Sequence, residues 1–127
     1  QIQVSTETAS ADIRGLLALP ARSRVIARRR RYLMDGAPVE LAESYVPSAI
    51  ASGTKVAEDD SGPGGIYARL EELGHRLKEF SEEVAARMPT PEERLRLQLP
   101  AGTPVLTVRR IAFDSNGTPV EVTDTVK

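Results

Sequence analysis

The chain has 127 residues, 40% of them hydrophobic and 28% charged, which is enough for one globular domain with a buried core. Its 17 basic and 18 acidic residues give a net charge of −1, which excludes a general attraction for polyanions such as nucleic acids. The absence of cysteine excludes disulfides and agrees with the cytoplasmic location that we expect, and no apolar run approaches the ~20 residues that a membrane helix needs.

The first predicted elements follow Ser10, whose hydroxyl is a typical helix N-cap. The short helix after it is expected to end at the Leu-Pro-Ala of residues 19–21, because the residue before a proline avoids the α region. The β-branched and basic run that follows predicts a strand, and Asp35-Gly36 predicts a tight turn. The alternating segment 37–46 then predicts a return strand.

Four consecutive arginines, Arg28 to Arg31, lie in the first of these strands. Alternate side chains of a strand face opposite ways, so we expect Arg28 and Arg30 on one face and Arg29 and Arg31 on the other. A nucleic-acid surface would need all four on one side. We therefore expect Arg29 and Arg31 to be solvated or paired, and we expect no strong, salt-dependent DNA binding by this run.

The middle of the chain begins with the loop sequence EDDSGPGG and continues into a predicted short helix, GIYARLEELG, which ends at Gly74. The glycine-rich turn lacks the spacing of phosphate-binding motifs and is interpreted as a connector. The next segment, 76–88, is ambiguous. The spacing of its large apolar residues fits a helix, whereas alternate residues could line one face of a strand, and the residues alone slightly favour the helix.

The last part of the chain repeats the plan of the first. Thr90 followed by proline and Glu93 has the form of a capping box, and another Leu-Pro-Ala ends that helix at residues 99–101. A strand, an Asn-Gly turn and a second strand follow. In the alignment of the two copies Arg30 falls on Arg110 and Glu40 on Glu121. We therefore predict two halves of one domain, each built as helix, strand, hairpin turn and strand.

The sequence offers no catalytic set. Its single histidine, His75, follows a helix-ending glycine and has no second histidine or cysteine with which to bind a metal. No serine nucleophile motif is present, and the carboxylates sit as neighbours on faces that we expect to be solvated. We therefore predict no enzymatic activity, no metal and no cofactor.

Three segments together resemble the UTRA domain, the effector-binding half of HutC-subfamily members of the GntR family of transcriptional regulators. They are RRRRYLMDGAPVELAESYVP, GPGGIYARLEELG and ERLRLQLPAGTPVLTVRRIAFDSNGTPVEV. The resemblance implies an α+β fold similar to chorismate lyase, a mostly antiparallel sheet with helices packed on it, in which residues 77–88 form a central strand. It also implies that residues 1–10 end an interdomain linker and that residues 11–127 form an effector domain cut short at its C-terminus.

The resemblance further implies the partners. A small-molecule effector would bind this domain in a cytoplasmic homodimer and alter its affinity for operator DNA. The DNA would bind an N-terminal winged-helix domain that is not in this chain. The alternative is a lyase-like enzyme acting on a small carboxylate, since the similar fold hosts a lyase, although no acid/base pair can be assembled near Arg30.

Sugar-phosphate sites of this family use two arginines, a glutamate and a hydroxyl at a helix start. The matching positions here are Arg30, Tyr32, Ala42 and Gly65, so three of the four polar anchors differ. The resemblance therefore implies a flatter and less charged effector than a phosphosugar. The expected effector-binding residues are Arg30, Tyr32, Ala42, Ser44, Gly64, Gly65, Ile66, Tyr67, Glu121 and Thr123.

Overall fold

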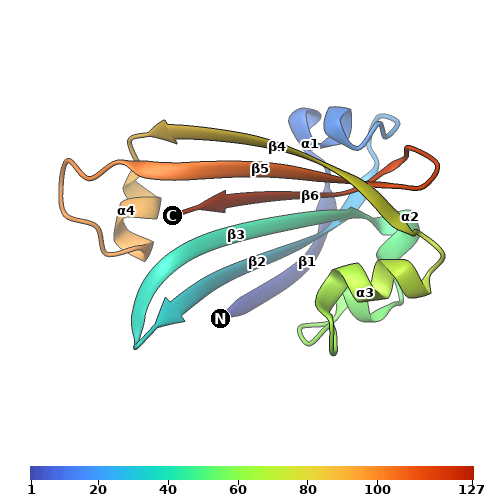
Figure 1. Ribbon diagram of the computed structural model, residues 1–127, viewed down its shortest axis with the longest axis horizontal. Coiled ribbons are helices and arrows are strands. Elements are labelled where there is room, and N and C mark those ends of the chain that lie inside the picture. Colours follow the sequence, from blue (N-terminus) through green and yellow to red (C-terminus); the bar gives the residue numbers. More distant parts are fainter.

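A computed structural model describes residues 1–127 and contains one antiparallel sheet of six strands, in the order β1-β2-β3-β6-β5-β4 (Figure 1). The strands are β1 (Ile2–Thr8), β2 (Arg24–Met34), β3 (Ala37–Pro47), β4 (Leu77–Arg87), β5 (Val105–Asp114) and β6 (Pro119–Val126). The helical elements are α1 (Ala11–Leu16), α2 (Ser48–Ala51), the 3-10 turn η1 (Lys55–Ala57), α3 (Gly65–Glu72) and α4 (Pro91–Arg96). The expected α+β class is confirmed.

None of these helices combines the length and the apolar character that crossing a bilayer requires.

The two halves of the sheet follow one plan, as the internal repeat predicts, and the structure adds a strand at the start of each half. The halves are β1-α1-β2-β3 and β4-α4-β5-β6. Their registers correspond, because Val4 pairs with Arg28 in the first half and Val84 with Val108 in the second. Strand β1 lies within residues 1–10, which the resemblance assigns to a linker. Strands β3 and β6 pair along the middle of the sheet, so an approximate two-fold axis passes between them.

The ambiguous segment 76–88 forms strand β4. The slight preference for a helix is wrong, because β4 pairs with β5 along nearly its whole length and Phe80, Val84 and Met88 remain exposed instead of forming a buried stripe. The resemblance correctly implies a strand, but β4 lies at the edge of the sheet and not at its centre, since β5 is its one neighbour. Long-range pairing here overrides the local periodicity.

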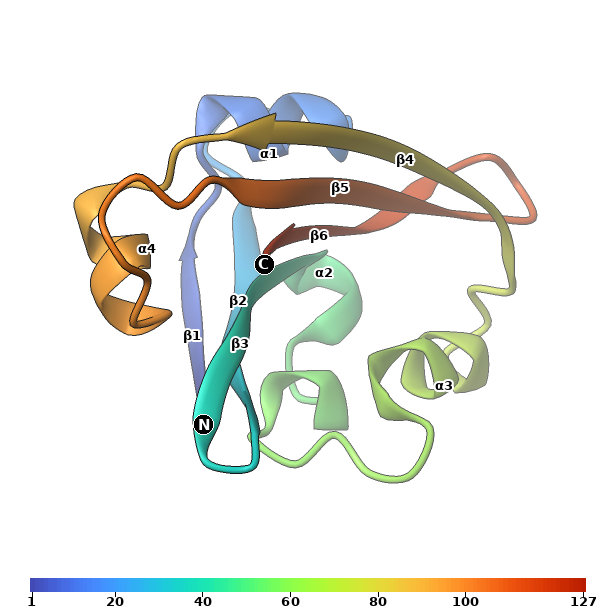
Figure 2. The ribbon, with the colours of Figure 1, turned by 60° about the vertical axis from the view of Figure 1, so that its left-hand side comes forward.

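Helices pack on both faces of the sheet (Figure 2). On one face α1 buries Ile13 and Leu17 against Val25 and Val122, and Leu97 at the end of α4 packs in a second small cluster. On the other face α2, η1 and α3 contribute to the larger core. That core is formed by Ile26, Val46, Ala51, Val56, Ile66, Leu70, Ala112 and Val120. These elements cover one end of the second face, where the middle strands also bury the polar side chains of Ser44 and Glu121.

Arg28 ties the η1 segment to the sheet. Its side chain is 3% exposed, and its guanidinium donates hydrogen bonds to the carbonyls of Val56 (2.8 Å), Glu58 and Asp59 (3.0 Å). Burial, followed by the nearby charge of Arg30, lowers the pKa of Arg28. A guanidinium is buried at low cost only where its donors have acceptors, so the fold of this turn and the position of Arg28 depend on each other.

We predict that Arg28→Met lowers the free energy of unfolding by about 2–4 kcal/mol, because the carbonyls of the η1 segment lose their donors inside the protein. Urea denaturation followed by circular dichroism measures the change. The matched control is Arg24→Met, on the same strand, where an exposed guanidinium donates to the carbonyl of Thr6. The control should lose less than about 1 kcal/mol. Equal losses in both variants would show that Arg28 is not a special anchor.

Candidate functional site

A chain of hydrogen bonds crosses the middle of the sheet on the face that α3 covers at one end. Arg30 of β2 donates from Nη2 to Oγ of Ser44 in β3. The hydroxyl oxygens of Ser44 and Thr123 of β6 lie 2.8 Å apart, and Thr123 donates to Oε2 of Glu121 at 2.8 Å. The chain therefore joins the two halves of the domain across the approximate two-fold axis.

The alternation of β2 decides which arginines reach this chain. Arg30 and Arg28 share its face, whereas Arg29 lies on the other side, where it forms ion pairs with Glu7 (2.8 Å) and Glu43 (2.9 Å). Arg31 reaches the carbonyl of Arg96 at 3.4 Å on that same side. The expected split of the arginine run is confirmed, and it leaves no continuous basic surface.

Glu121 is the buried end of the chain. Its side chain is 1% exposed, and burial raises its pKa to about 7, although Thr123, Arg30 and Arg110 act in the opposite direction. Its Oε1 atom is buried without a hydrogen-bond partner. Buried polar atoms in proteins are normally satisfied by protein, water or ligand, so this oxygen marks a place where a further donor belongs.

A cavity of about 240 Å³ lies beside the chain. Thr123 belongs both to the hydrogen-bond chain and to the cavity wall, and Tyr67 of α3 stands on the opposite side. Burial, with the Glu121 carboxylate as the next cause, raises the pKa of Tyr67 to about 12, so its hydroxyl stays protonated at neutral pH. The residues around the cavity are Glu40, Tyr67, Glu82, Val108, Arg110, Thr123, Thr125 and Lys127.

The Gly64-Gly65 turn sets where α3 begins and so where Tyr67 stands. Both residues have positive φ, +84° and +67°, and a Cβ atom at position 64 would lie 2.7 Å from Cβ of Ala68. Only glycine therefore fits at position 64 without strain. The neighbouring Ile66 packs in the core, whereas Tyr67 borders the cavity, so the two expected residues of this helix have different environments.

Two other expected residues, Tyr32 and Ala42, do not border the smaller cavity. Tyr32 is 44% exposed near the tip of the β2–β3 hairpin, with its ring centre 6.0 Å from the guanidinium carbon of Arg30. Ala42 is buried directly opposite Arg30, between β2 and β6, and its small side chain leaves room above the sheet. The structure thus brings Arg30, Ser44, Tyr67, Glu121 and Thr123 to one region and places Tyr32 at its margin.

Sequence reasoning missed Arg110 and Glu82, which stand opposite each other on β5 and β4 at this cavity. The guanidinium carbon of Arg110 lies 4.1 Å from the ring centre of Phe80 and 5.8 Å from that of Tyr67. The internal repeat was a usable signal for Arg110, because it aligns with Arg30. Glu82 could be found only once segment 76–88 is known to be a strand.

A larger cavity, of about 510 Å³, lies on the opposite face near α4. Arg109 there pairs with Asp124 at 2.7 Å, and Arg87 pairs with Glu93 at 2.7 Å. Arg30 and Ala42, two of the expected effector-binding residues, also line this larger cavity. No group of three or more His, Asp or Glu side chains in the structure could hold a metal ion.

A curved antiparallel sheet with a polar cavity beside a helix is an arrangement that can bind a small molecule. The chain belongs to the UTRA domain family, whose model matches residues 1–127. The relatives and solved structures that it resembles are transcriptional regulators and not lyases, so the comparisons support the regulator interpretation over the lyase-like alternative.

Two solved structures and one sequence relative illustrate the likeness. A ligand-binding domain of a GntR-family regulator from Bordetella bronchiseptica superposes with a TM-score of 0.86 at 25% identity, over 99% of this chain and 80% of that one. The C-terminal domain of the histidine utilization repressor from Pseudomonas syringae gives 0.84 at 23% identity, over 98% and 88%, and supports the fold alone. An HTH-type transcriptional regulator of Streptomyces coelicolor is 33% identical over 121 residues, which are 93% of this chain and 45% of that protein. The chain thus spans less than half of its curated relatives.

We predict that Glu121 makes stability fall as the pH rises. Its pKa is raised to about 7 in the folded state from an ordinary 4.5, so between these values the folded protein holds a proton that the unfolded chain releases. As the pH rises from 4.5 to 8, this carboxyl should lower the free energy of unfolding by about 3 kcal/mol. Glu121→Gln should remove that decrease. Urea denaturation of both proteins at pH 5 and pH 8 measures it.

The control for this experiment is Glu92→Gln, at an exposed position of α4. It should leave the difference in stability between pH 5 and pH 8 as in the original protein. The same pH dependence in Glu121→Gln as in the original protein would show that Glu121 does not hold its proton on folding.

Proposed function

We propose that this chain is the effector-sensing domain of a DNA-binding transcriptional regulator, and that the effector binds at the cavity beside Arg30, Ser44, Thr123 and Glu121. The observation that carries the proposal is the set of polar atoms with unused hydrogen-bonding capacity at one place. Nε of Arg30, Nε of Arg110 and Oε1 of Glu121 are all buried without partners. Nε of Arg28, Arg31 and Arg69 is in the same state elsewhere, so the distinguishing atom of this site is the carboxyl oxygen of Glu121. A ligand that supplied those partners would bind the folded domain and not the unfolded chain. Binding would therefore stabilise the fold.

We also propose that the domain works as a homodimer joined through β4. Both faces of this edge strand are exposed from Lys78 to Arg87, and its outer hydrogen-bonding groups have no neighbouring strand. Phe80, Val84 and Met88 form an exposed apolar row on one face. In an antiparallel pair with Val84 on the two-fold axis, Phe80 would meet Met88 of the partner subunit, so the strand is complementary to a second copy of itself.

The position of β4 suggests how binding and DNA affinity are coupled. Glu82 contributes to the cavity, and its neighbours on the same face belong to the proposed dimer contact. An effector that contacts this strand would favour one arrangement of the two subunits. Because each subunit would carry a DNA-binding domain outside this chain, that preference alters operator affinity by linkage, with about 1–3 kcal/mol sufficient for a several-fold to hundredfold response.

We predict that a thermal-shift screen of small polar metabolites against this chain identifies compounds that raise its melting temperature, and that Arg30→Met weakens their binding about tenfold or more. The reason is the loss of a charged donor at the end of the hydrogen-bond chain. Arg31→Met is the control, because the next residue on β2 faces the other way. If no compound stabilises the domain, or if both variants bind equally well, the proposed site is wrong.

We predict that Val84→Lys converts a dimer into a monomer, because two ammonium groups would meet on the two-fold axis without a counter-charge. Analytical ultracentrifugation at about 10–100 μM protein measures the oligomeric state. Ala85→Lys is the control: in the same register its side chain would face Glu83 of the partner subunit, on the other face, and the dimer should persist. A chain that is monomeric before mutation, or a dimeric Val84→Lys, would contradict the proposed contact.

A further inference from the structure

The charges around the smaller cavity are balanced. Its wall contains two carboxylates, Glu40 and Glu82, and two basic groups, Arg110 and Lys127. Lys127 lies 3.7 Å from Glu40, so these two groups compensate each other. Arg110 and Glu82 stand directly opposite each other on neighbouring strands but form no ion pair within 4 Å. Arg110 and Glu82 therefore have no ionic partner within 4 Å, although Glu82 is exposed to solvent and the charge of Arg110 acts on the buried Glu121.

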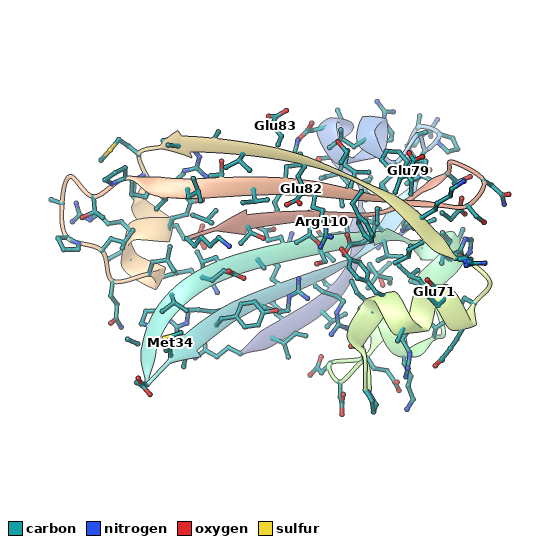
Figure 3. The ribbon with its side chains drawn as sticks, in the orientation of Figure 1. Met34, Glu71, Glu79, Glu82, Glu83 and Arg110 are labelled. Atoms are coloured by element: carbon teal, nitrogen blue, oxygen red, sulfur yellow. The ribbon has the colours of Figure 1, made fainter.

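The guanidinium of Arg110 lies against two aromatic rings. It lies 4.1 Å from the ring centre of Phe80 and within cation–π distance of Tyr67, and its Nε is buried without an acceptor. Figure 3 shows that Glu82 and Glu83 leave β4 on opposite sides and that Glu82 lies next to Arg110. The aromatic contacts orient the guanidinium beside the cavity.

We propose that the effector is a small zwitterion, an α-amino acid, whose carboxylate binds Arg110 and whose ammonium group binds Glu82. This inference rests on the proposed function, and it names the chemical class that the same cavity accepts. Directly opposed residues of two strands are about 5 Å apart at Cβ, which suits ligand charges separated by one or two carbon atoms. The hydroxyls of Thr123 and Tyr67 border the same cavity and supply further hydrogen bonds.

Other ligand classes fit this wall less well. A doubly negative ligand such as a sugar phosphate would meet only one basic group, Arg110, that has no carboxylate within ion-pair distance, and it would leave Glu82 without a partner. A neutral sugar would leave the charges of both Arg110 and Glu82 without a partner. A zwitterion satisfies both groups and brings no net charge into a partly buried site. The volume of about 240 Å³ is below the range of pockets for drug-sized ligands and is suited to a single small metabolite.

The test uses this chain with the twenty standard amino acids as probes, each at millimolar concentration, in thermal-shift measurements followed by calorimetric titration of those that stabilise it. We expect at least one amino acid to bind. Its methyl ester, which lacks the carboxylate, and its N-acetyl derivative, which lacks the ammonium group, should each bind about tenfold more weakly or worse.

Variants test which residue binds each charged group of the amino acid. Glu82→Gln should weaken binding of the amino acid about tenfold while leaving the affinity of its N-acetyl derivative unchanged. Arg110→Lys keeps the positive charge but loses the planar guanidinium. It should weaken binding of the amino acid and leave the affinity of its methyl ester unchanged. Glu83→Gln, the neighbouring residue on the opposite face, should bind like the original protein. Equal affinity of Glu82→Gln and the original protein for the amino acid would overturn the assignment.

The failure of this inference is separable from failure of the proposed function. Binding of glucose 6-phosphate without binding of any amino acid would overturn the zwitterion class and leave the effector-sensing role in place. Absence of binding by all twenty amino acids would also overturn the class, and the wider metabolite screen then decides independently whether the cavity binds another kind of molecule.

Discussion

The pairing of β3 with β6 is the interaction on which the rest of the structure depends. It joins two chain segments that are far apart in the sequence and makes one sheet out of two similar three-stranded units. At its centre the hydroxyls of Ser44 and Thr123 meet, which links Arg30 of the first unit to Glu121 of the second. Without this seam the polar groups of each half would face water separately, and there would be no shared cavity between them.

The polar centre of the sheet limits stability at the place where we propose the binding site. Small side chains such as Ala42, Ser44 and Thr123 line the seam where larger apolar residues would bury more surface, and Glu121 is buried with one oxygen unpaired. The aliphatic core under α2 and α3 and the anchoring of η1 by Arg28 offset that cost. Concentrated, partly unsatisfied polarity in an otherwise conventional sheet is typical of a site shaped by ligand binding.

The cavity and the exposed edge of the sheet are adjacent, and this arrangement suits a sensor. The strand that carries Glu82 is an edge strand with no neighbour on its outer side, so a ligand contact and a subunit contact would act on the same eleven-residue element. Such proximity would make the coupling direct, because a ligand shifts an equilibrium only through interactions that differ between the two states.

Much of the fold could be predicted from the residues. The capping box at Thr90, the Leu-Pro-Ala helix ends and the Asp-Gly and Asn-Gly turns are local signals, and local sequence determines them. The repeat, the two faces of the arginine run and the UTRA resemblance also came from the sequence, since alternation along a strand needs no knowledge of its partners. Only the tertiary structure decided that segment 76–88 is an edge strand, that Arg110 stacks on Phe80, and that Glu121 is buried without a full set of partners. Each of these depends on which distant strand lies alongside, and a single sequence does not encode that pairing in any local pattern.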